Sequence, residues 1–436
     1  MTHRGGAEDA RVVDADKVMR ARVLLLGSGR LSEHQEVEAY RVLAPVSPAV
    51  YAPKLVWRLG GVRATTPERR EELALEAVAV ARLLDPGHPQ RTEVLCQALG
   101  RYGSELLRQG RRAEALGVCR ESAAVGREGY ERGQVDHPAY GSGRLITVLS
   151  EEGRYAEALE ARGDRTETDF WSAVEGSALR EAAGRSDEAV AVFGEFLAEK
   201  RTAAAEGRTA LAILVWSLLR QAEVLDRAGR PYEAGERRRE AGAALARLAA
   251  GGEPVSWSNI QEWWVTLFLL SGRPDEPPAS AGAPGPCFGE DARHWSPDVR
   301  QAFAESTETL EAEKAVLAER AATDPVRLLP ALVTAHRRFT LRAALRAAHR
   351  SHRILDALRP VFDEGVALGR RLSPAAEVRA LTDRASMLLA AGAYGEAHAD
   401  FAAAQSLRAA AVGAPAPAPA PATAPPAAAP APVTAG

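Results

Sequence analysis

Apolar residues recur three and four positions apart along most of this chain, which is the spacing that places them on one face of an α-helix. Ala, Leu, Glu and Arg are abundant, whereas stretches in which Val, Ile, Thr or aromatic residues alternate with polar ones are scarce. Both features favour helix. The sequence therefore predicts an all-α fold with almost no strand.

Five helix starts can be read from the sequence. At each one a side chain that can cap a helix precedes a proline, and proline suits the first helical position because an N–H there would have no partner inside the helix. The five pairs are Ser47-Pro48, Thr66-Pro67, Ser296-Pro297, Asp324-Pro325 and Ser373-Pro374. Further helices are predicted at residues 16–26 and 32–43.

A short phrase, EEGRYAEALE at residues 151–160, has relatives that begin at positions 108, 181, 226 and 390. Each contains the end of a helix, a glycine and the start of a second helix. Glycine tolerates the left-handed backbone that lets the chain reverse, and an alanine five residues later lets two antiparallel helices approach closely. The clearest glycine and alanine pairs are Gly110 with Ala115, Gly153 with Ala158, Gly184 with Ala189 and Gly229 with Ala234.

This arrangement resembles the tetratricopeptide repeat family, whose unit is a helix-turn-helix of about 34 residues. Four residues after each alanine the family usually has a bulky residue, but this chain has Cys119, Arg162, Phe193 and Arg238. The turn glycines are also unevenly spaced, so the repeats are degenerate. The resemblance covers most of residues 17–272 and again 373–411. It implies a right-handed solenoid of antiparallel helical hairpins.

The composition along the chain predicts five regions. Residues 1–15 are expected to be a flexible N-terminus, and residues 16–272 a first helical lobe. Residues 273–296 are rich in Pro and Gly and are expected to form a long loop between lobes. A second helical lobe that ends in a repeat-like hairpin is expected at residues 297–411, followed by a disordered Ala/Pro tail at 412–436.

Charge and cysteine content restrict the partners and the cellular compartment that we expect for this chain. The net charge of -3 argues against a general nucleic-acid or membrane-surface binder. The three cysteines have no metal-type spacing, and the longest apolar runs, near residues 210 and 263, are too short to span a membrane. We expect a cytoplasmic protein with reduced thiols and no membrane contact. The strong excess of arginine over lysine is typical of the coding bias of a high-GC bacterium.

In tetratricopeptide proteins the first helix of each repeat lines the inner groove. Counting back thirteen residues from each turn glycine reaches the expected groove positions, which are Gln97, Tyr140, Trp171, Trp216 and Asn259. Aromatic residues at this position of three consecutive repeats predict a ladder that could hold an extended peptide or a partner helix. The alternative is that degeneracy shifts this register by one or two residues and that the rings belong to the core.

A second candidate surface lies in residues 336–353. Arg338, Arg342, Arg346 and Arg350 recur at steps of four, so they neighbour one another on a helix and form a basic stripe. The stripe could bind phosphate, nucleic acid or an acidic segment. Alternatively it is solvated or paired with glutamates of the preceding helix, which are Glu305, Glu308, Glu311, Glu313 and Glu319.

One group of side chains that could take part in catalysis lies in the loop before Trp295; it consists of Glu290, Asp291 and His294. These residues would equally keep a loop soluble and cap the next helix. We therefore expect no enzyme, no cofactor and no metal. The sequence predicts a scaffold that binds an unidentified protein or peptide in its groove; the alternatives are a nucleic-acid-associated regulator that uses the basic stripe and a hydrolase hidden in the loop.

Overall fold

The computed structural model describes residues 14–27, 29–163, 169–255, 258–348 and 355–413. Throughout this part of the chain the fold is helical, and no strand is formed, which confirms the predicted all-α class. The regions predicted to be a flexible N-terminus and a disordered tail lie almost wholly outside the described residues. Helix α1 already begins at Ala15, and α18 reaches Gly413.

The first half of the chain forms α1 (Ala15–Leu26), α2 (Glu33–Leu43), α3 (Pro48–Leu59), α4 (Pro67–Ala81), α5 (Arg91–Arg108), α6 (Arg112–Glu131), α7 (Gly143–Glu151), α8 (Tyr155–Arg162), α9 (Phe170–Ala182) and α10 (Ser186–Ala205). The second half forms α11 (Leu211–Arg227), α12 (Pro231–Gly251), α13 (Ile260–Ser271), the 3-10 turn η1 (Arg273–Asp275), α14 (Pro297–Thr323), α15 (Pro325–Ala348), α16 (Leu355–Leu372), α17 (Pro374–Ala390) and α18 (Tyr394–Gly413).

All five prolines that were predicted to start a helix do so, at α3, α4, α14, α15 and α17. Three of the residues before them also cap the helix through a side-chain oxygen, which accepts a backbone N–H three residues later. Thr66, Asp324 and Ser373 make this bond at 3.3, 3.3 and 3.2 Å. The local chemistry of each start is therefore sufficient to place it.

The five repeated phrases form five hairpins with the same turn. Their glycines, Gly110, Gly153, Gly184, Gly229 and Gly392, have φ between 71° and 77°, the left-handed region that favours glycine. The residue after each glycine donates its N–H to the carbonyl five residues earlier, at 2.8–2.9 Å. The alanines five positions after these glycines have no exposed surface. A larger side chain there would separate the two helices, which explains the phrase.

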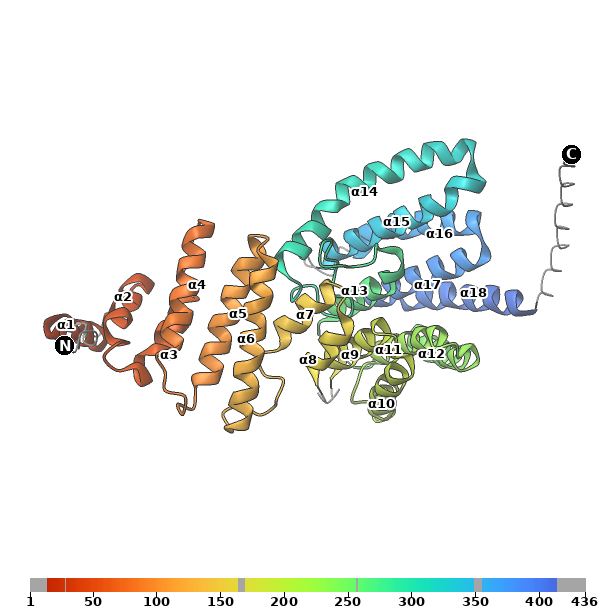
Figure 1. Cartoon of the computed structure of the whole chain (residues 1–436). Coiled ribbons are helices and arrows are strands. Elements are labelled where there is room, and N and C mark those ends of the chain that lie inside the picture. Colours follow the sequence, from red (N-terminus) through yellow and green to blue (C-terminus); the bar gives the residue numbers. More distant parts are fainter. Residues whose placement is uncertain (1–13, 28, 164–168, 256–257, 349–354, 414–436) are drawn as a thin grey trace, which may run out of the picture.

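From α1 to α12, every helix packs against the next one in the chain, and Figure 1 shows α1 to α6 side by side in one row. The order changes after α12. Helix α13 packs against α15 and α17, and the last helix, α18, returns to lie against α12 (Figure 1). Sequential stacking therefore describes the first half, whereas the second half folds back on itself.

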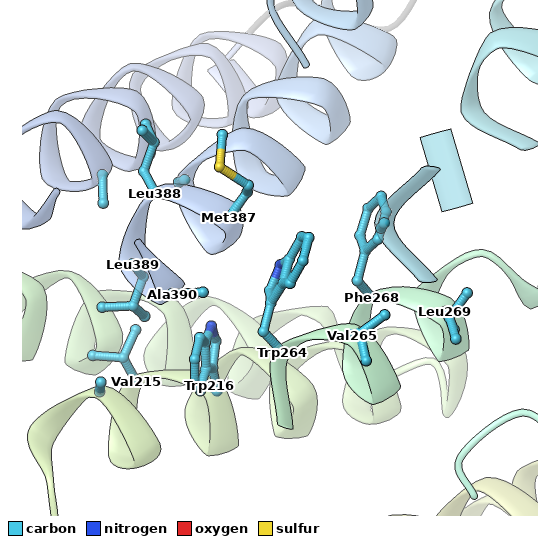
Figure 2. Close-up of a cluster of buried hydrophobic side chains, with 14 of the residues drawn as sticks. Val215, Trp216, Trp264, Val265, Phe268, Leu269, Met387, Leu388, Leu389 and Ala390 are labelled. Carbon is cyan, nitrogen blue, oxygen red and sulfur yellow. The ribbon is translucent and has the colours of Figure 1, made fainter. Parts of the chain in front are cut away.

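The largest hydrophobic core lies where the chain folds back. Figure 2 shows Trp216 of α11 and Trp264 of α13 beneath Met387 and Leu388 of α17. The same cluster includes side chains on both sides of the Pro/Gly-rich segment, from Leu197 to Phe401. A single core therefore continues across the position where a boundary between two lobes was expected.

The segment between η1 and α14 is irregular, as predicted, but it is packed into the core and does not act as a spacer. Cys287 and Trp295 are buried in the largest cluster, and Trp295 Nε1 donates to the Cys287 carbonyl at 3.0 Å. The segment also docks on the first half, because Glu151 accepts hydrogen bonds from the N–H groups of Gly285 and Ser296, at 2.9 and 2.8 Å.

A buried ion network secures this docking. Arg112, at the start of α6, contacts three carboxylates: Glu151, Glu152 at 3.2 Å and Asp298 of α14 at 2.8 Å. The Glu151 side chain has no exposed surface, and that of Arg112 is 10% exposed. One guanidinium thus links acids from two distant parts of the sequence.

Candidate functional site

A groove of about 1040 Å³ follows α5 in the first half of the chain. Helices α3 and α4 form one side of it, and α6, α7 and the end of the Pro/Gly-rich segment form the other. The residues that α5 presents to the groove recur three or four positions apart, so they share one face of the helix. They are Cys96, Gln97, Gly100, Arg101, Ser104, Glu105 and Arg108.

Glu105 is the ionised acid of this groove, and two arginines share it. Arg70 of α4 donates through Nε at 3.1 Å, and Arg108, one turn further along α5, also pairs with it. The carboxylate is largely buried between them. Two guanidinium groups on one carboxylate leave a surplus positive charge at this end of the groove.

Arg101 lies half-buried near the middle of the groove. Its Nη1 donates to the Val56 carbonyl at 3.0 Å, and no carboxylate of the described residues pairs with it. Burial lowers the pKa of Arg101, but a guanidinium stays charged at any physiological pH. Gly60 makes room for this side chain, since a Cβ added there would lie 1.4 Å from Arg101 Nη1.

Arg144 stands on the opposite wall, in the first turn of α7. Its Nη1 donates to the His294 carbonyl at 2.7 Å, and within the described part of the chain no acid pairs with it. Arg101 and Arg144 are therefore two cations that line one groove and have only neutral carbonyl partners. Carbonyls position a guanidinium without cancelling its charge, so both remain available to an anion.

Glu290 contributes a second carboxyl to the groove. The Thr147 hydroxyl of α7 lies within hydrogen-bonding distance of both carboxyl oxygens, at 3.1 and 3.0 Å. Burial, and then the nearby charge of Glu175, raises the pKa of Glu290 to about 8. This carboxyl is mostly protonated at neutral pH. Four arginines and two glutamates line the groove, so cationic side chains outnumber acidic ones.

The predicted aromatic ladder is not assembled. Trp216 is 2% exposed and lies in the largest core, so its ring cannot meet a ligand in a groove. Trp171 is half-buried against Phe170 and Trp263, beside the segment that carries Glu290. Tyr140 precedes α7, and Asn259 precedes α13 in a left-handed conformation. The four residues lie in different surroundings.

The physical reason is that the first helices differ in length. Counting back thirteen residues reaches the interior of α5 and α11 but passes the start of α7, which is only nine residues long. Gln97, on the longer α5, does line the groove. Its neighbours one and two turns along the same face, Arg101 and Ser104 among them, could have been found by continuing that helical periodicity.

The basic stripe on α15 is largely paired inside the protein. Arg338 and Arg342 both contact Glu276, which follows η1, and the Arg342 guanidinium lies 3.8 Å from the centre of the Phe303 ring. Arg346 donates to the Ala304 carbonyl at 3.1 Å. Arg350 lies outside the described residues. The alternative in which the stripe pairs with the five glutamates of α14 is replaced by pairing with Glu276, which the irregular segment brings against α15.

Of the three loop residues considered for catalysis, Glu290 has the raised pKa described above. Asp291 is held by Arg293 at 2.9 Å, and His294 is exposed at the groove edge. Among the described residues, no three His, Cys, Asp or Glu side chains come together in a way that could hold a metal ion. Nor does any helix in this part of the chain have the length and apolarity to cross a membrane.

Neither models of known protein families nor curated proteins give a match for this chain. The groove therefore has to be interpreted from its own geometry and charge.

Proposed function

We propose that the protein is a non-enzymatic, cytoplasmic scaffold of the tetratricopeptide-repeat type, a right-handed solenoid in its first half. In this proposal the groove along α5 binds an acidic segment of a partner protein. The observation that carries the proposal is the pair Arg101 and Arg144, which line opposite walls of the groove without an acid partner.

The groove has properties that suit an extended acidic chain. It runs along α5, so a peptide could meet Arg108, Arg101 and Arg144 in succession and pair a carboxylate with each. Arginine binds carboxylates through two parallel hydrogen bonds, which gives such contacts direction as well as charge. Protonated Glu290 can add a hydrogen-bond donor and leaves the positive potential intact.

The nucleic-acid regulator suggested by the basic stripe has less support. Arg338 and Arg342 contact Glu276 at a side-chain exposure of 23% and 4%, so little of their charge is available to phosphate. We therefore assign binding to the α5 groove and treat nucleic acid as an alternative ligand in its test.

The test is fluorescence anisotropy with a labelled peptide of alternating glutamate and serine, at low and moderate salt. Arg101→Gln combined with Arg144→Gln should weaken binding about tenfold or more, because charge-assisted hydrogen bonds contribute about 1.5–3 kcal/mol each. Arg127→Gln is the matched control, because Arg127 is exposed on α6 outside the groove.

Equal binding by the double variant and the wild type would refute the assignment to this groove. Binding of a single-stranded oligonucleotide more tightly than the peptide would refute the acidic protein segment as ligand. Far-ultraviolet circular dichroism of each variant checks that the helices are retained.

A further inference from the structure

A second groove, of about 1050 Å³, lies where the chain folds back, between the α11–α12 hairpin and the α17–α18 hairpin. Part of its wall is apolar: Val378, Leu407 and Tyr232 line it, and the Tyr232 side chain is 76% exposed. The exposed Tyr232 and the half-buried Leu407 suit a ligand that carries apolar groups of its own, whereas Val378 is itself buried.

The carboxylates that line this groove already have arginine partners. Glu223 pairs with Arg227 at 3.8 Å, Asp226 pairs with Arg238, and Asp383 pairs with Arg337 at 2.8 Å. Each of these acids thus already has an arginine in contact. Asp226 and Glu223 also attract a further guanidinium in the groove, but neither forms an ion pair with it.

Arg408 of α18 is such a guanidinium. It lines the groove, forms no ion pair with the described residues, and its Nη1 is buried without a hydrogen-bond partner among them. One turn earlier on the same helix, Gln405 Nε2 is likewise buried and unpartnered. Burial, and then repulsion from Arg238, lowers the pKa of Arg408 to about 10.

An unsatisfied cation beside another cation is unfavourable for the folded state, and buried donors normally have partners. Two such donors on adjacent turns, facing one groove, are the arrangement that an oxyanion would complete. The apolar wall distinguishes this groove from a simple phosphate site, since phosphate or a nucleic-acid backbone would gain nothing from Val378, Leu407 or Tyr232.

We propose that this groove binds an amphipathic acidic segment of a partner protein, with a carboxylate of the segment bonded to Arg408 and Gln405 and its apolar side chains against α12 and α17. The site is separate from the α5 groove and does not depend on the function proposed for it. The second half of the chain thereby gains its own recognition surface.

The experiment measures binding of a labelled peptide of alternating glutamate and leucine to the full chain and to Arg408→Gln. Arg371→Gln is the matched control, because Arg371 is exposed on α16 and does not line the groove. We expect Arg408→Gln to weaken binding about tenfold or more and to melt at the same or a higher temperature, because it removes an unpaired charge. The control should change neither quantity.

A peptide with glutamine in place of glutamate, and inorganic phosphate alone, separate the possible sources of binding. Equal affinity for the glutamine peptide and the glutamate peptide would overturn the role of the carboxylate. A rise in melting temperature with phosphate equal to the rise with the peptide would overturn the protein segment as ligand. Failure of the wild type to bind the acidic peptide, or unchanged binding by Arg408→Gln, would overturn the site. Because the α5 groove can also take up an acidic peptide, the comparison is repeated in the Arg101 and Arg144 double variant, where the loss of binding caused by Arg408→Gln should persist.

Discussion

Replacing Arg112 by methionine should destabilise the protein far more than its position at the start of a helix suggests. Methionine keeps much of the volume but removes the one positive charge that pairs with Glu151, Glu152 and Asp298. Glu151 has no exposed surface, so its carboxylate would remain buried without a cation. Breaking a buried ion pair in this way costs about 3–5 kcal/mol. The two added acids place the expected loss of unfolding free energy at the upper end of that range.

The neighbouring Arg111 provides a matched control. It also pairs with two glutamates, Glu71 and Glu114, but its side chain is 35% exposed. Exposed ion pairs contribute little to stability, so Arg111→Met should cost much less unfolding free energy than Arg112→Met. Urea denaturation followed by circular dichroism gives both values. A loss for Arg112→Met that does not exceed the loss for Arg111→Met would refute the reasoning.

The pH dependence of the same variant gives an independent check. Burial raises the pKa of Glu151 above its ordinary value of 4.5, and the Arg112 charge opposes that rise. Without Arg112 the pKa should rise further. A carboxyl whose folded pKa is raised favours the folded state when protonated and opposes it as pH increases through that pKa. The loss of unfolding free energy caused by Arg112→Met should therefore be smaller at about pH 5 than at about pH 8. An equal loss at both pH values would contradict this account.

Three further outcomes follow from buried residues. Ala158→Leu should cost about 1–3 kcal/mol, because the alanine has no exposed surface and a larger side chain would force two helices apart; a neutral effect on urea denaturation would contradict the packing. Trp216→Ala should lose about 3–5 kcal/mol of stability, as expected for core, and a loss of peptide binding at normal stability would return Trp216 to a groove. The wild type should lose stability and acidic-peptide affinity as the pH rises through about 8, because Glu290 then ionises in the folded protein. Glu290→Gln should not show this loss, and identical pH profiles of the two proteins would show that Glu290 does not titrate there.

Local chemistry explains which parts of the fold could be predicted. A capping residue before proline, or a glycine followed five residues later by alanine, acts within one or two helical turns, so the sequence contains the whole signal. The return of α18 to α12 depends on contacts between residues far apart in the chain, and no short pattern specifies them. Nor does a Pro/Gly-rich composition reveal that Trp295, within the predicted loop at residues 273–296, will be buried.

The candidate sites show the same limit. Periodicity placed Gln97 on the groove face because α5 is long and regular, but the same count missed at α7, which is short. Arg338 and Arg342 were found as a stripe, yet their partner Glu276 comes from an irregular segment whose path could not be inferred. The same periodicity could have placed Arg101 on the groove face, but the lack of an acid partner at Arg101 and Arg144 is recognisable only when their surroundings are known.

The packing of α18 against α12 also has a consequence for how the protein is made. A ribosome delivers the chain from the N-terminus, so α1 to α8 can stack as they emerge, each on the helix before it. Helices α11 to α13 cannot complete their packing at that stage, because Met387 and Leu388, which cover the core around Trp216 and Trp264, are synthesised much later. We expect chains arrested before α17 to have a protease-resistant first half and a cleavable second half. Equal resistance of both halves would mean that α11 to α13 fold without their cover.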